Sequence, residues 1–342
     1  MADRPDPHPR RSPEFLAEVA RAYWERDLTQ AQIARQLDIS RSQVSRYLQA
    51  ARDEGIVQIR VVGPETRVTE LEKALVERFS HLRDAVVVPA FTTDEVVIRS
   101  AVARAAATTI ERLVSPGDTV CFGAGHTLAA TVQMLASQRV DGVQIVQAMG
   151  NAGHEGLDID YNAIAHTAAR AFGGRAIQIN APAVLGSGTD AASLERSNAS
   201  IHDALELARN AAVYVFGVGS LAGDLLYART GLISLADLEE LAQAGAVGDI
   251  CANFFDLRGR STPGPLAGRT VGITLDVLRA APVTVACAAG PSKVAALTGA
   301  LTGRLTNVLV TDEHAARGVL ALVGTDPRIA KTDASMKAGG HN

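Results

Sequence analysis

The strongest constraint on this chain is the stretch LTQAQIARQLDISRSQVSRYL at residues 28–48. Thr29 is an expected helix N-cap, because apolar residues follow it at helical spacing, namely Ala31, Ile33, Ala34 and Leu37. Asp38-Ile39-Ser40 interrupts that pattern. Ser40 is then expected to cap a second helix, with Gln43 as its partner in a capping box. The stretch therefore predicts two short helices joined by a tight turn, the helix-turn-helix arrangement of DNA-binding domains.

The second of these helices has an apolar face and a basic polar face. Val44, Tyr47 and Leu48 are expected to face inward, against the first helix. From Ser40 to Arg52 the sequence holds three arginines and no acidic residue. The residues expected to contact DNA phosphates and base edges are Thr29, Gln30, Ser40, Arg41, Ser42, Gln43, Ser45 and Arg46. The alternative is a surface helical hairpin with a solvated face, which the agreement of period, caps, turn and charge disfavours.

Length and composition place this unit beside a larger folded domain. A chain of 342 residues is long for one domain, and a hydrophobic content of 47% is ample for a sizeable core. The net charge of -4 does not by itself suggest a nucleic-acid partner. However, the second helix of the motif is locally basic, and its local positive potential is the one that acts on a DNA duplex bound there.

Cysteine usage and the chain's ends bear on the compartment. Cys121, Cys251 and Cys287 are widely spaced in apolar stretches, which predicts buried free thiols in a reducing cytoplasm rather than disulfides or a zinc site. Residues 1–13 lack the apolar core of a signal peptide, and no apolar run is long enough to span a membrane. We expect a cytoplasmic protein with no membrane partner, bound metal or cofactor.

The chain divides into five predicted segments. These are a flexible tail (1–13), a helix-turn-helix DNA-binding domain (14–63), a linker helix (64–80), an effector domain (81–328) and a second flexible tail (329–342). Within the first domain, Ile56–Val62 predicts a short strand, or wing. The linker helix carries a narrow apolar stripe of Val68, Leu71, Leu75 and Phe79. This stripe packs either on the next domain or on the same helix of a second subunit, and we favour the dimer contact.

From about residue 85, short apolar runs alternate with helical stretches. The runs cover residues 85–88, 119–122, 143–147, 176–179, 213–216, 283–287 and 308–310. The helical stretches cover residues 96–113, 127–136, 159–172, 191–209, 292–301 and 313–320. Continuously apolar strands that alternate with helices predict a Rossmann-like α/β domain, whose mainly parallel sheet is covered on both faces.

Two loops of this domain are candidate anion sites, because ligands of such sheets bind beyond the carboxyl ends of strands. Gly123-Ala124-Gly125-His126-Thr127 opens a helix, and its glycines let backbone amides approach an anion. Ala289-Gly290-Pro291-Ser292-Lys293 also opens a helix, where a lysine is unfavourable for the helix dipole unless an anionic ligand offsets it. The structural alternatives are a tight glycine turn in the first loop and an inconsequential exposed lysine in the second.

Two further stretches are less specific indications of a ligand-binding site. Gly217 and Gly219 follow an apolar strand and indicate a close backbone approach, although a plain turn explains them equally well. Asp249 and Asn253 lie in the otherwise apolar segment 245–256, where a buried carboxylate needs partners such as sugar hydroxyls. The alternative for Asp249 is a structural carboxylate that caps a turn or helix.

Together these segments resemble the SorC family of bacterial sugar-responsive transcriptional regulators, and among them the deoxyribonucleoside regulators. The resemblance covers about residues 14–322 and is carried by QAQIARQLDISRSQVSRYL, EGIVQIRV, VGVGSL, GAVGDICANFFDLRG, AGPSKVAALTGAL and TNVLVTDEHAA. It implies an effector domain with a fold similar to phosphosugar isomerases and glucosamine-6-phosphate deaminase, used for sensing rather than catalysis.

The resemblance also implies an effector site. The family's Gly-Thr-Thr phosphate loop falls on Gly125-His126-Thr127, so that His126 replaces a threonine, and its Gly-Gly-x-x-Lys falls on Ala289–Lys293, where Ala289 replaces the first glycine. Its Gly-Asp pair falls on Gly248-Asp249. The loop Ala148-Met149-Gly150-Asn151 offers no lysine for a Schiff base, so we expect noncovalent binding. The expected effector-binding residues are Gly123, Gly125, His126, Thr127, Gly217, Gly219, Asp249, Asn253, Gly290 and Lys293.

The combined expectation is a transcriptional regulator of carbohydrate or nucleoside catabolism, controlled by a phosphorylated sugar or polyol. It would bind a double-stranded DNA operator as a homo-oligomer and would not be an enzyme. The competing hypothesis is a sugar-phosphate isomerase or deaminase fused to a DNA reader, with Asp249, His126 or His154 as general base. A nucleotide-binding oxidoreductase is disfavoured, because Leu128 stands where the dinucleotide fingerprint needs its third glycine.

Overall fold

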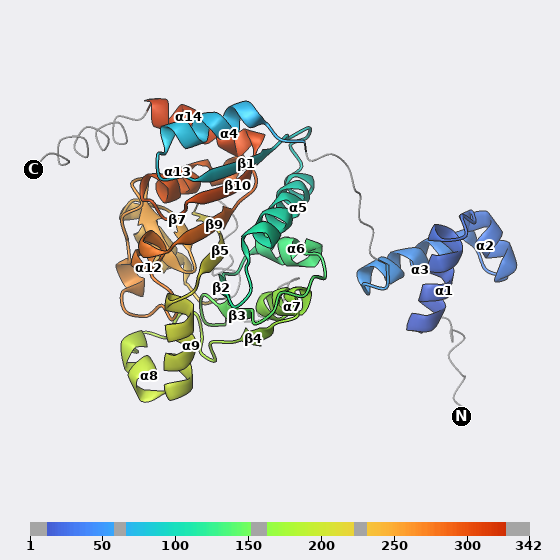
Figure 1. The fold of residues 1–342 in the computed structure, drawn as a ribbon, viewed down its shortest axis with the longest axis horizontal. Coiled ribbons are helices and arrows are strands. Elements are labelled where there is room, and N and C mark those ends of the chain that lie inside the picture. Colours follow the sequence, from blue (N-terminus) through green and yellow to red (C-terminus); the bar gives the residue numbers. More distant parts are fainter. Residues whose placement is uncertain (1–11, 58–65, 152–162, 222–230, 326–342) are drawn as a thin grey trace, which may run out of the picture. The chain divides into compact units, whose positions relative to one another are not determined.

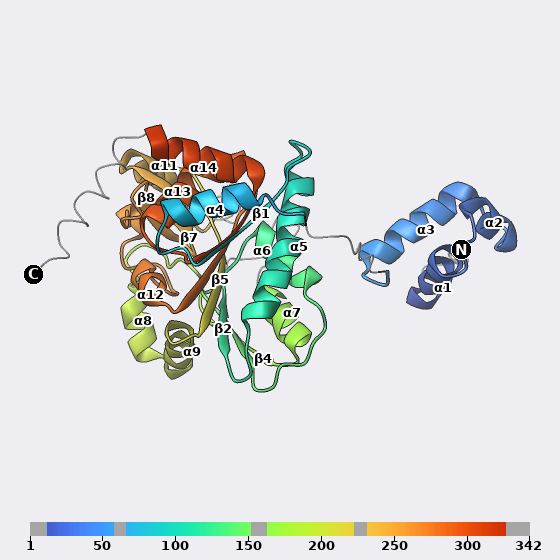
Figure 2. The ribbon, with the colours of Figure 1, turned by 45° about the horizontal axis from the view of Figure 1, so that its top comes forward.

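The computed structural model describes residues 12–57, 66–151, 163–221 and 231–325. It divides the chain into two compact units, Met1–Pro64 and Glu65–Asn342. Figures 1 and 2 show the N-terminal unit as a small helical body and the C-terminal unit as a sheet wrapped by helices. Each unit is described below by itself.

The N-terminal unit consists of α1 (Pro13–Trp24), α2 (Gln30–Gln36) and α3 (Arg41–Asp53). The predicted helix starts are confirmed, since Thr29 and Ser40 each cap a helix through a complete capping box with Gln32 and Gln43. Val44, Tyr47 and Leu48 are buried, as predicted. The small core is closed by an edge-to-face contact of the Phe15 and Tyr47 rings, whose centroids lie 5.4 Å apart.

The predicted wing at Ile56–Val62 falls mostly on residues outside the described ranges. Of its residues, Ile56 and Val57 are described, and they pack against the three-helix core without forming a strand. The predicted tails also lie almost entirely outside the described residues.

The C-terminal unit is built on the parallel sheet that the sequence predicts. Its seven strands lie in the order β1-β10-β9-β5-β2-β3-β4. Their bounds are β1 (Asp84–Val88), β2 (Thr119–Phe122), β3 (Gln144–Gln147), β4 (Arg175–Ile177), β5 (Val213–Gly217), β9 (Val283–Cys287) and β10 (Val308–Asp312). Every neighbouring pair in this sheet is parallel, so the carboxyl ends of β9, β5 and β2 lie side by side at one edge.

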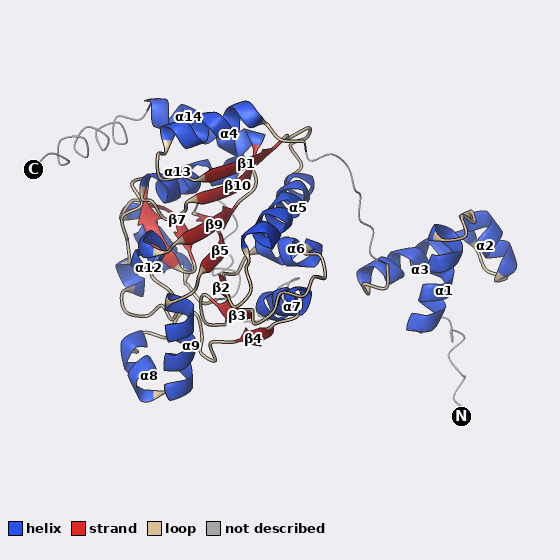
Figure 3. Ribbon diagram, viewed as in Figure 1, coloured by secondary structure: helices blue, strands red, loops and turns tan. Residues whose placement is uncertain are grey.

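Helices cover both faces of this sheet, as Figure 3 shows. On one face lie α5 (Glu95–Leu113), α6 (His126–Met134) and α7 (Ala163–Phe172), which pack against one another in that order. On the other lie α4 (Thr69–Arg78), α14 (Glu313–Thr325) and α9 (Ala199–Arg209). The predicted helix over residues 191–209 is two helices, since Asn198 ends α8 (Ala191–Ser197) and caps α9.

A second, three-stranded antiparallel sheet was not predicted. It comprises β6 (Gly219–Ser220), β7 (Ala246–Ile250) and β8 (Asn253–Asp256), and it packs against α13 (Val294–Thr302). The hairpin between β7 and β8 turns through Cys251 and Ala252, whose φ angles are 50° and 59°. Such turns normally carry Asn-Gly or Asp-Gly, so this pair of residues gave no hairpin signal. Three more short helices, α11 (Leu235–Gln243), α12 (Leu275–Ala280) and the 3-10 turn η1 (Gly264–Leu266), were not predicted either.

The favoured dimer contact through the linker helix is wrong. Leu71, Leu75 and Phe79 of α4 are buried within their own unit, where α4 packs on β1 and α14. Backbone bonds also fix this segment to the open edge of β1, since the Val68 N–H donates to the Val87 carbonyl over 2.8 Å. The stripe is therefore core, and it is unavailable to a second subunit.

Three features of the described residues bear on the remaining expectations from composition. Cys121, Cys251 and Cys287 are buried free thiols, and burial raises the pKa of each. No described helix is long and apolar enough to cross a bilayer. The described histidines, cysteines and carboxylates form no group that suits a metal ion.

His81, between α4 and β1, makes the C-terminal unit sensitive to acid. Its Nε2 is buried without a partner in the described structure, and burial together with nearby Arg304 lowers its pKa to about 4 from 6.5. The unfolded chain therefore takes up this proton first, and the free energy of unfolding falls as pH drops from 6.5 towards 4. We predict that His81→Gln flattens this decline between pH 7 and pH 5 in urea unfolding, whereas His166→Gln, at an exposed position of α7, does not. Equal slopes for wild type and His81→Gln would contradict the assignment.

Candidate functional site

The N-terminal unit presents a basic face along α3. Arg41, Ser42, Ser45 and Arg46 are all exposed. Within the described residues, neither arginine is tied to a carboxylate, and the nearby Asp53 accepts instead from Gln49 over 2.8 Å. A structural ion pair of Arg46 is therefore not observed, and both guanidinium groups are available to a phosphate or a base edge.

The other predicted contact residues of this unit carry a local structural role as well. The Gln43 Oε1 accepts from the Ser40 backbone N–H over 2.9 Å, and the Ser40 and Ser42 hydroxyls lie 2.9 Å apart. Thr29 is bound in the same way to Gln32. These side chains fix where each helix begins, so they set the position of the two arginines even where they do not touch a ligand.

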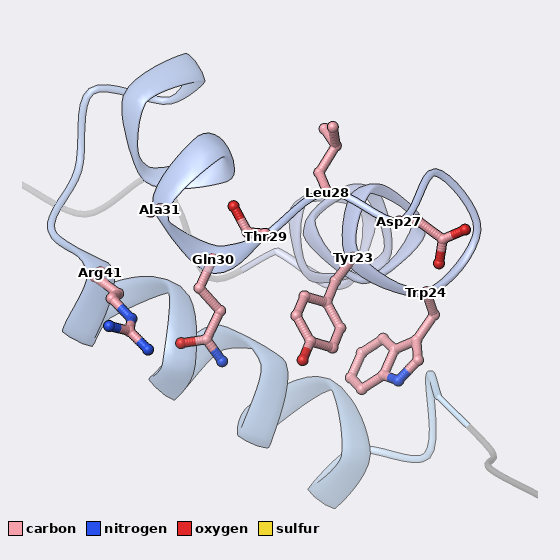
Figure 4. Close-up of a pocket in the computed structure, with 8 residues that line it drawn as sticks. All are labelled: Tyr23, Trp24, Asp27, Leu28, Thr29, Gln30, Ala31 and Arg41. Carbon is pink, nitrogen blue, oxygen red and sulfur yellow. The ribbon is translucent and has the colours of Figure 1, made fainter.

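A surface pocket of about 680 Å³ lies beside this basic face. Figure 4 shows the side chains of Tyr23, Trp24, Gln30 and Arg41 directed to the same side of the three-helix unit. Tyr23 and Trp24 are both half-buried, and the rings of both border this pocket. The Arg52 guanidinium lies 5.2 Å from the centre of the Trp24 ring. Sequence reasoning missed both aromatic residues, although rings with a polar tip are typical of such half-buried positions.

In the C-terminal unit, the predicted glycine loops meet at one edge of the sheet. The loops that follow β2, β5 and β9 come from three adjacent strands, so Gly125, Gly217 and Gly290 lie along neighbouring carboxyl ends. Gly123 is a packing residue, because a Cβ there would lie 3.0 Å from the Cys251 Sγ. Gly217 has ordinary room for a side chain, with the Ala124 carbonyl oxygen 3.5 Å from a Cβ.

Asp249 is the buried carboxylate of this edge. It lies on β7, it is 3% exposed, and its Oδ2 accepts from the Ala252 N–H over 3.1 Å. Gly219 pairs with it across β6 and β7, and a Cβ on Gly219 would collide with the Asp249 carboxylate. Gly219 is thus the residue that makes room for a charged group in this core, which the sequence indicated only as a close backbone approach.

Lys293 lies within electrostatic range of the same carboxylate. It ends the 3-10 turn η2 (Pro291–Lys293), directly before α13. Burial lowers the pKa of Lys293, the charges of Asp249 and Glu95 oppose that shift, and Arg99 adds to it. Within the described residues, no acceptor lies within hydrogen-bond distance of its amine. The structure therefore joins two predicted residues, Asp249 and Lys293, in one electrostatic cluster, and it adds Glu95 and Arg99, which the sequence did not single out.

The two helical turns at this edge lack side-chain caps. Gly125 precedes α6 with φ at 140°, and Gly290 precedes η2 with φ at 97°, and neither provides a capping side chain. In contrast, side chains cap α2, α3, α5, α8, α9, α11 and α12. The start of α6, at His126 and Thr127, thus has no side-chain cap, and a helix start favours a negatively charged group.

Asp312 fixes one of these turns, and sequence reasoning assigned it no role. It is fully buried at the end of β10, where its Oδ2 accepts from the Gly290 N–H over 2.6 Å and its Oδ1 from the His314 N–H over 2.9 Å. Its position, as the first charge after an apolar strand, was the available signal. Asp312 therefore ties the turn that carries Lys293 to the start of α14.

Asn253 is engaged by the backbone. Its Nδ2 lies within 3.1 Å of the Ile250 carbonyl and 2.9 Å of the Cys251 and Ile273 carbonyls. These bonds hold the β7–β8 hairpin and occupy the donors that a ligand would need. His154, a candidate base of the competing hypothesis, lies outside the described residues.

Comparison with known proteins agrees with this two-unit arrangement. The sugar-binding domain family matches residues 64–321, and the homeodomain-like domain family matches residues 17–60. The chain is 33% identical to the deoxyribonucleoside regulator of Bacillus subtilis over 311 residues, which cover 91% of this chain and 98% of that protein. It is 32% identical to the transcriptional regulator LsrR of an Enterobacter strain, over 91% of this chain and 94% of that protein.

A solved structure shows the same fold. The full-length sorbitol operon regulator SorC of Klebsiella pneumoniae superposes with a TM-score of 0.68 at 27% identity, over 90% of this chain and 99% of that one. The family match covers most of the chain, and both units are accounted for. The chain belongs to the SorC family of sugar-binding transcriptional regulators, with an N-terminal helix-turn-helix and a C-terminal sugar-binding domain.

Proposed function

We propose that this regulator binds a double-stranded DNA operator with an affinity that a phosphorylated sugar or polyol controls. The observation that carries the proposal is the cluster of Lys293, Asp249 and the uncapped start of α6 at one edge of the sheet. Similarity to regulators named for deoxyribonucleosides and for the sorbitol operon supports a role in carbohydrate or nucleoside catabolism. Such a protein would act in the cytoplasm.

The chemistry of the cluster suits a ligand with an anionic end and a hydroxylated end. Lys293 supplies a full positive charge that is partly desolvated, and the backbone of α6 supplies donors beside Thr127 and His126. Asp249 offers carboxylate oxygens, which accept from sugar hydroxyls. His126 donates where the family has a threonine, so one hydroxyl is lost at the phosphate loop. Among the glycines of the predicted set, Gly219 leaves room for the Asp249 carboxylate.

We assign the chain a regulatory rather than an enzymatic role. Its relatives of known name are transcriptional regulators. Asp249, the first candidate for a general base, faces a lysine and accepts from the Ala252 N–H. Turnover of a bound sugar phosphate would restore the enzyme hypothesis.

Coupling between effector binding and DNA binding requires only that the effector's affinity differs between two arrangements of the oligomer. An effector shifts the regulator when it binds one arrangement of the oligomer more tightly than another. Because one helix-turn-helix reads few base pairs, we propose that two copies engage the operator together.

The exposed arginines of α3 give the first prediction. Replacing Arg46 or Arg41 with Ala should weaken specific operator binding by about 1–3 kcal/mol where the residue reads a base, or lower the salt dependence where it contacts phosphate. Mobility-shift titrations at several salt concentrations measure both effects. Arg196→Ala, an exposed arginine of the C-terminal unit, is the matched control. Unchanged binding by both α3 variants would move the DNA contact elsewhere.

Lys293 gives the second prediction. Lys293→Met should weaken binding of a sugar phosphate about 10- to 100-fold, because a charge-assisted hydrogen bond is lost, and should leave operator binding intact. Lys73→Met, at an exposed position of α4, is the matched control. Thr127→Val, which removes a hydroxyl and no charge, should weaken the same ligand less.

The effector test is a thermal-shift screen against phosphorylated and free sugars and polyols, followed by calorimetry. A true effector far above its dissociation constant raises the melting temperature of the wild type. If Lys293→Met binds the phosphorylated ligand as tightly as wild type, the phosphate assignment is wrong. If the wild type prefers the free sugar or polyol, His126 has changed the site and the ligand is not phosphorylated.

Oligomeric state gives the third prediction. Light scattering should report a dimer or a tetramer, and operator half-sites should be spaced by about 10 bp or a multiple, so that two readers meet the same face of the duplex. A monomer both free and on DNA would contradict the proposal.

A further inference from the structure

A pocket of about 570 Å³ is lined by residues of α5, α6 and α7. His126, at the first position of α6, lines this pocket and also belongs to the phosphate loop. The volume lies within the range of small-molecule sites. Most of its lining is apolar, but Arg99 and Ser100 of α5 and Thr167 of α7 add polar groups. The pocket and the proposed phosphate loop thus share His126, and no function described so far uses the pocket.

Arg99 is the unusual member of this lining. Glu95 precedes it by four residues on α5, a spacing at which glutamate and arginine commonly pair on a helix. Yet within the described residues Arg99 forms no ion pair and no side-chain hydrogen bond. The Glu95 side chain lies near the loop that follows β9, since its Oε1 is 3.5 Å from the position that a Cβ on Gly290 would take. Arg99 instead borders the pocket.

Arg99 also stands within electrostatic reach of Lys293. The two positive charges disfavour each other, and Arg99 contributes to the lowered pKa of Lys293. Arg99 and Lys293 therefore repel each other in the empty protein, and anions bound beside these two cations offset that repulsion. A single phosphate held by Lys293 and the start of α6 accounts for one of them. Arg99, which lies on α5 and opens onto the pocket beyond His126, is left for another group.

We propose that Arg99 is a specificity residue which binds a second anionic group, a carboxylate or a phosphate, at the end of the effector opposite its first phosphate. The effector would then be a phosphorylated sugar acid or a doubly phosphorylated sugar or polyol. This inference rests on the proposed function and narrows its ligand class. A guanidinium matches both groups, because its parallel N–H donors fit two oxygens of a carboxylate or of a phosphate.

The test compares ligands that differ at one end only. Sorbitol 6-phosphate, 6-phosphogluconate and sorbitol 1,6-bisphosphate carry a hydroxymethyl, a carboxylate and a phosphate at the first carbon, and the corresponding five-carbon set covers a shorter ligand. Calorimetry on the full-length wild type should give about 10- to 100-fold tighter binding for at least one two-anion ligand than for its monophosphate partner. Whichever of the acid and the bisphosphate binds more tightly identifies the second group.

Variants then assign that preference to Arg99. Arg99→Met should remove the preference for a two-anion ligand while changing monophosphate binding less than about twofold. Arg99→Lys should retain part of this preference. Arg104→Met, at an exposed position on the same helix, should retain all of this preference. Equal affinity of the wild type for one-anion and two-anion ligands would overturn this inference alone. So would an Arg99→Met variant that weakens every sugar phosphate alike, since Arg99 would then share the first phosphate with Lys293. If no sugar phosphate binds the wild type, the proposed function fails and this inference with it.

Discussion

The structure of the proposed effector site depends on a buried carboxylate within electrostatic range of a lysine. Asp249 has almost no access to solvent, and a charge removed from water in this way needs a partner. Lys293 faces it from the turn before α13. Gly219 is required because any side chain there would displace the carboxylate, and Asp312 holds the turn at Gly290 that brings the lysine near. One electrostatic requirement thus accounts for features of three separate loops near the carboxyl ends of the strands.

The two units rely on different kinds of interaction. In the N-terminal unit the helix starts are fixed by residues three positions apart, as in the Ser40–Gln43 capping box. In the C-terminal unit the key contacts join residues far apart in the chain, such as Gly290 with Asp312 and the small sheet with α13. Contacts between residues a few positions apart can be predicted from a short window of sequence. Contacts between residues far apart in the chain form only once the sheet has formed.

This difference decides what the sequence revealed. Thr29, Ser40 and the buried face of α3 were predicted because caps and helical spacing are local signals. The parallel strands were predicted because short, continuously apolar runs that alternate with helical stretches are typical of buried parallel sheets. The β7–β8 hairpin was missed because Cys251 and Ala252 adopt a left-handed turn without glycine or asparagine. Arg99 and Glu95 were missed because nothing in a helix of mixed composition tells which of its charges will border a pocket, and the stripe of α4 was misassigned because a short apolar face fits a partner helix and a sheet equally well.

The central claim is that the ligand bound at the Asp249–Lys293 cluster and the DNA bound at α3 influence each other through one protein. Linkage requires the influence to be mutual and equal in size. The most direct measurement is the affinity of the full-length protein for the sugar phosphate found by thermal shift, with and without a saturating operator, beside its operator affinity with and without that ligand. The account predicts that both affinities change by the same factor, in the same direction. A sugar phosphate that binds tightly and leaves operator affinity unchanged would contradict it.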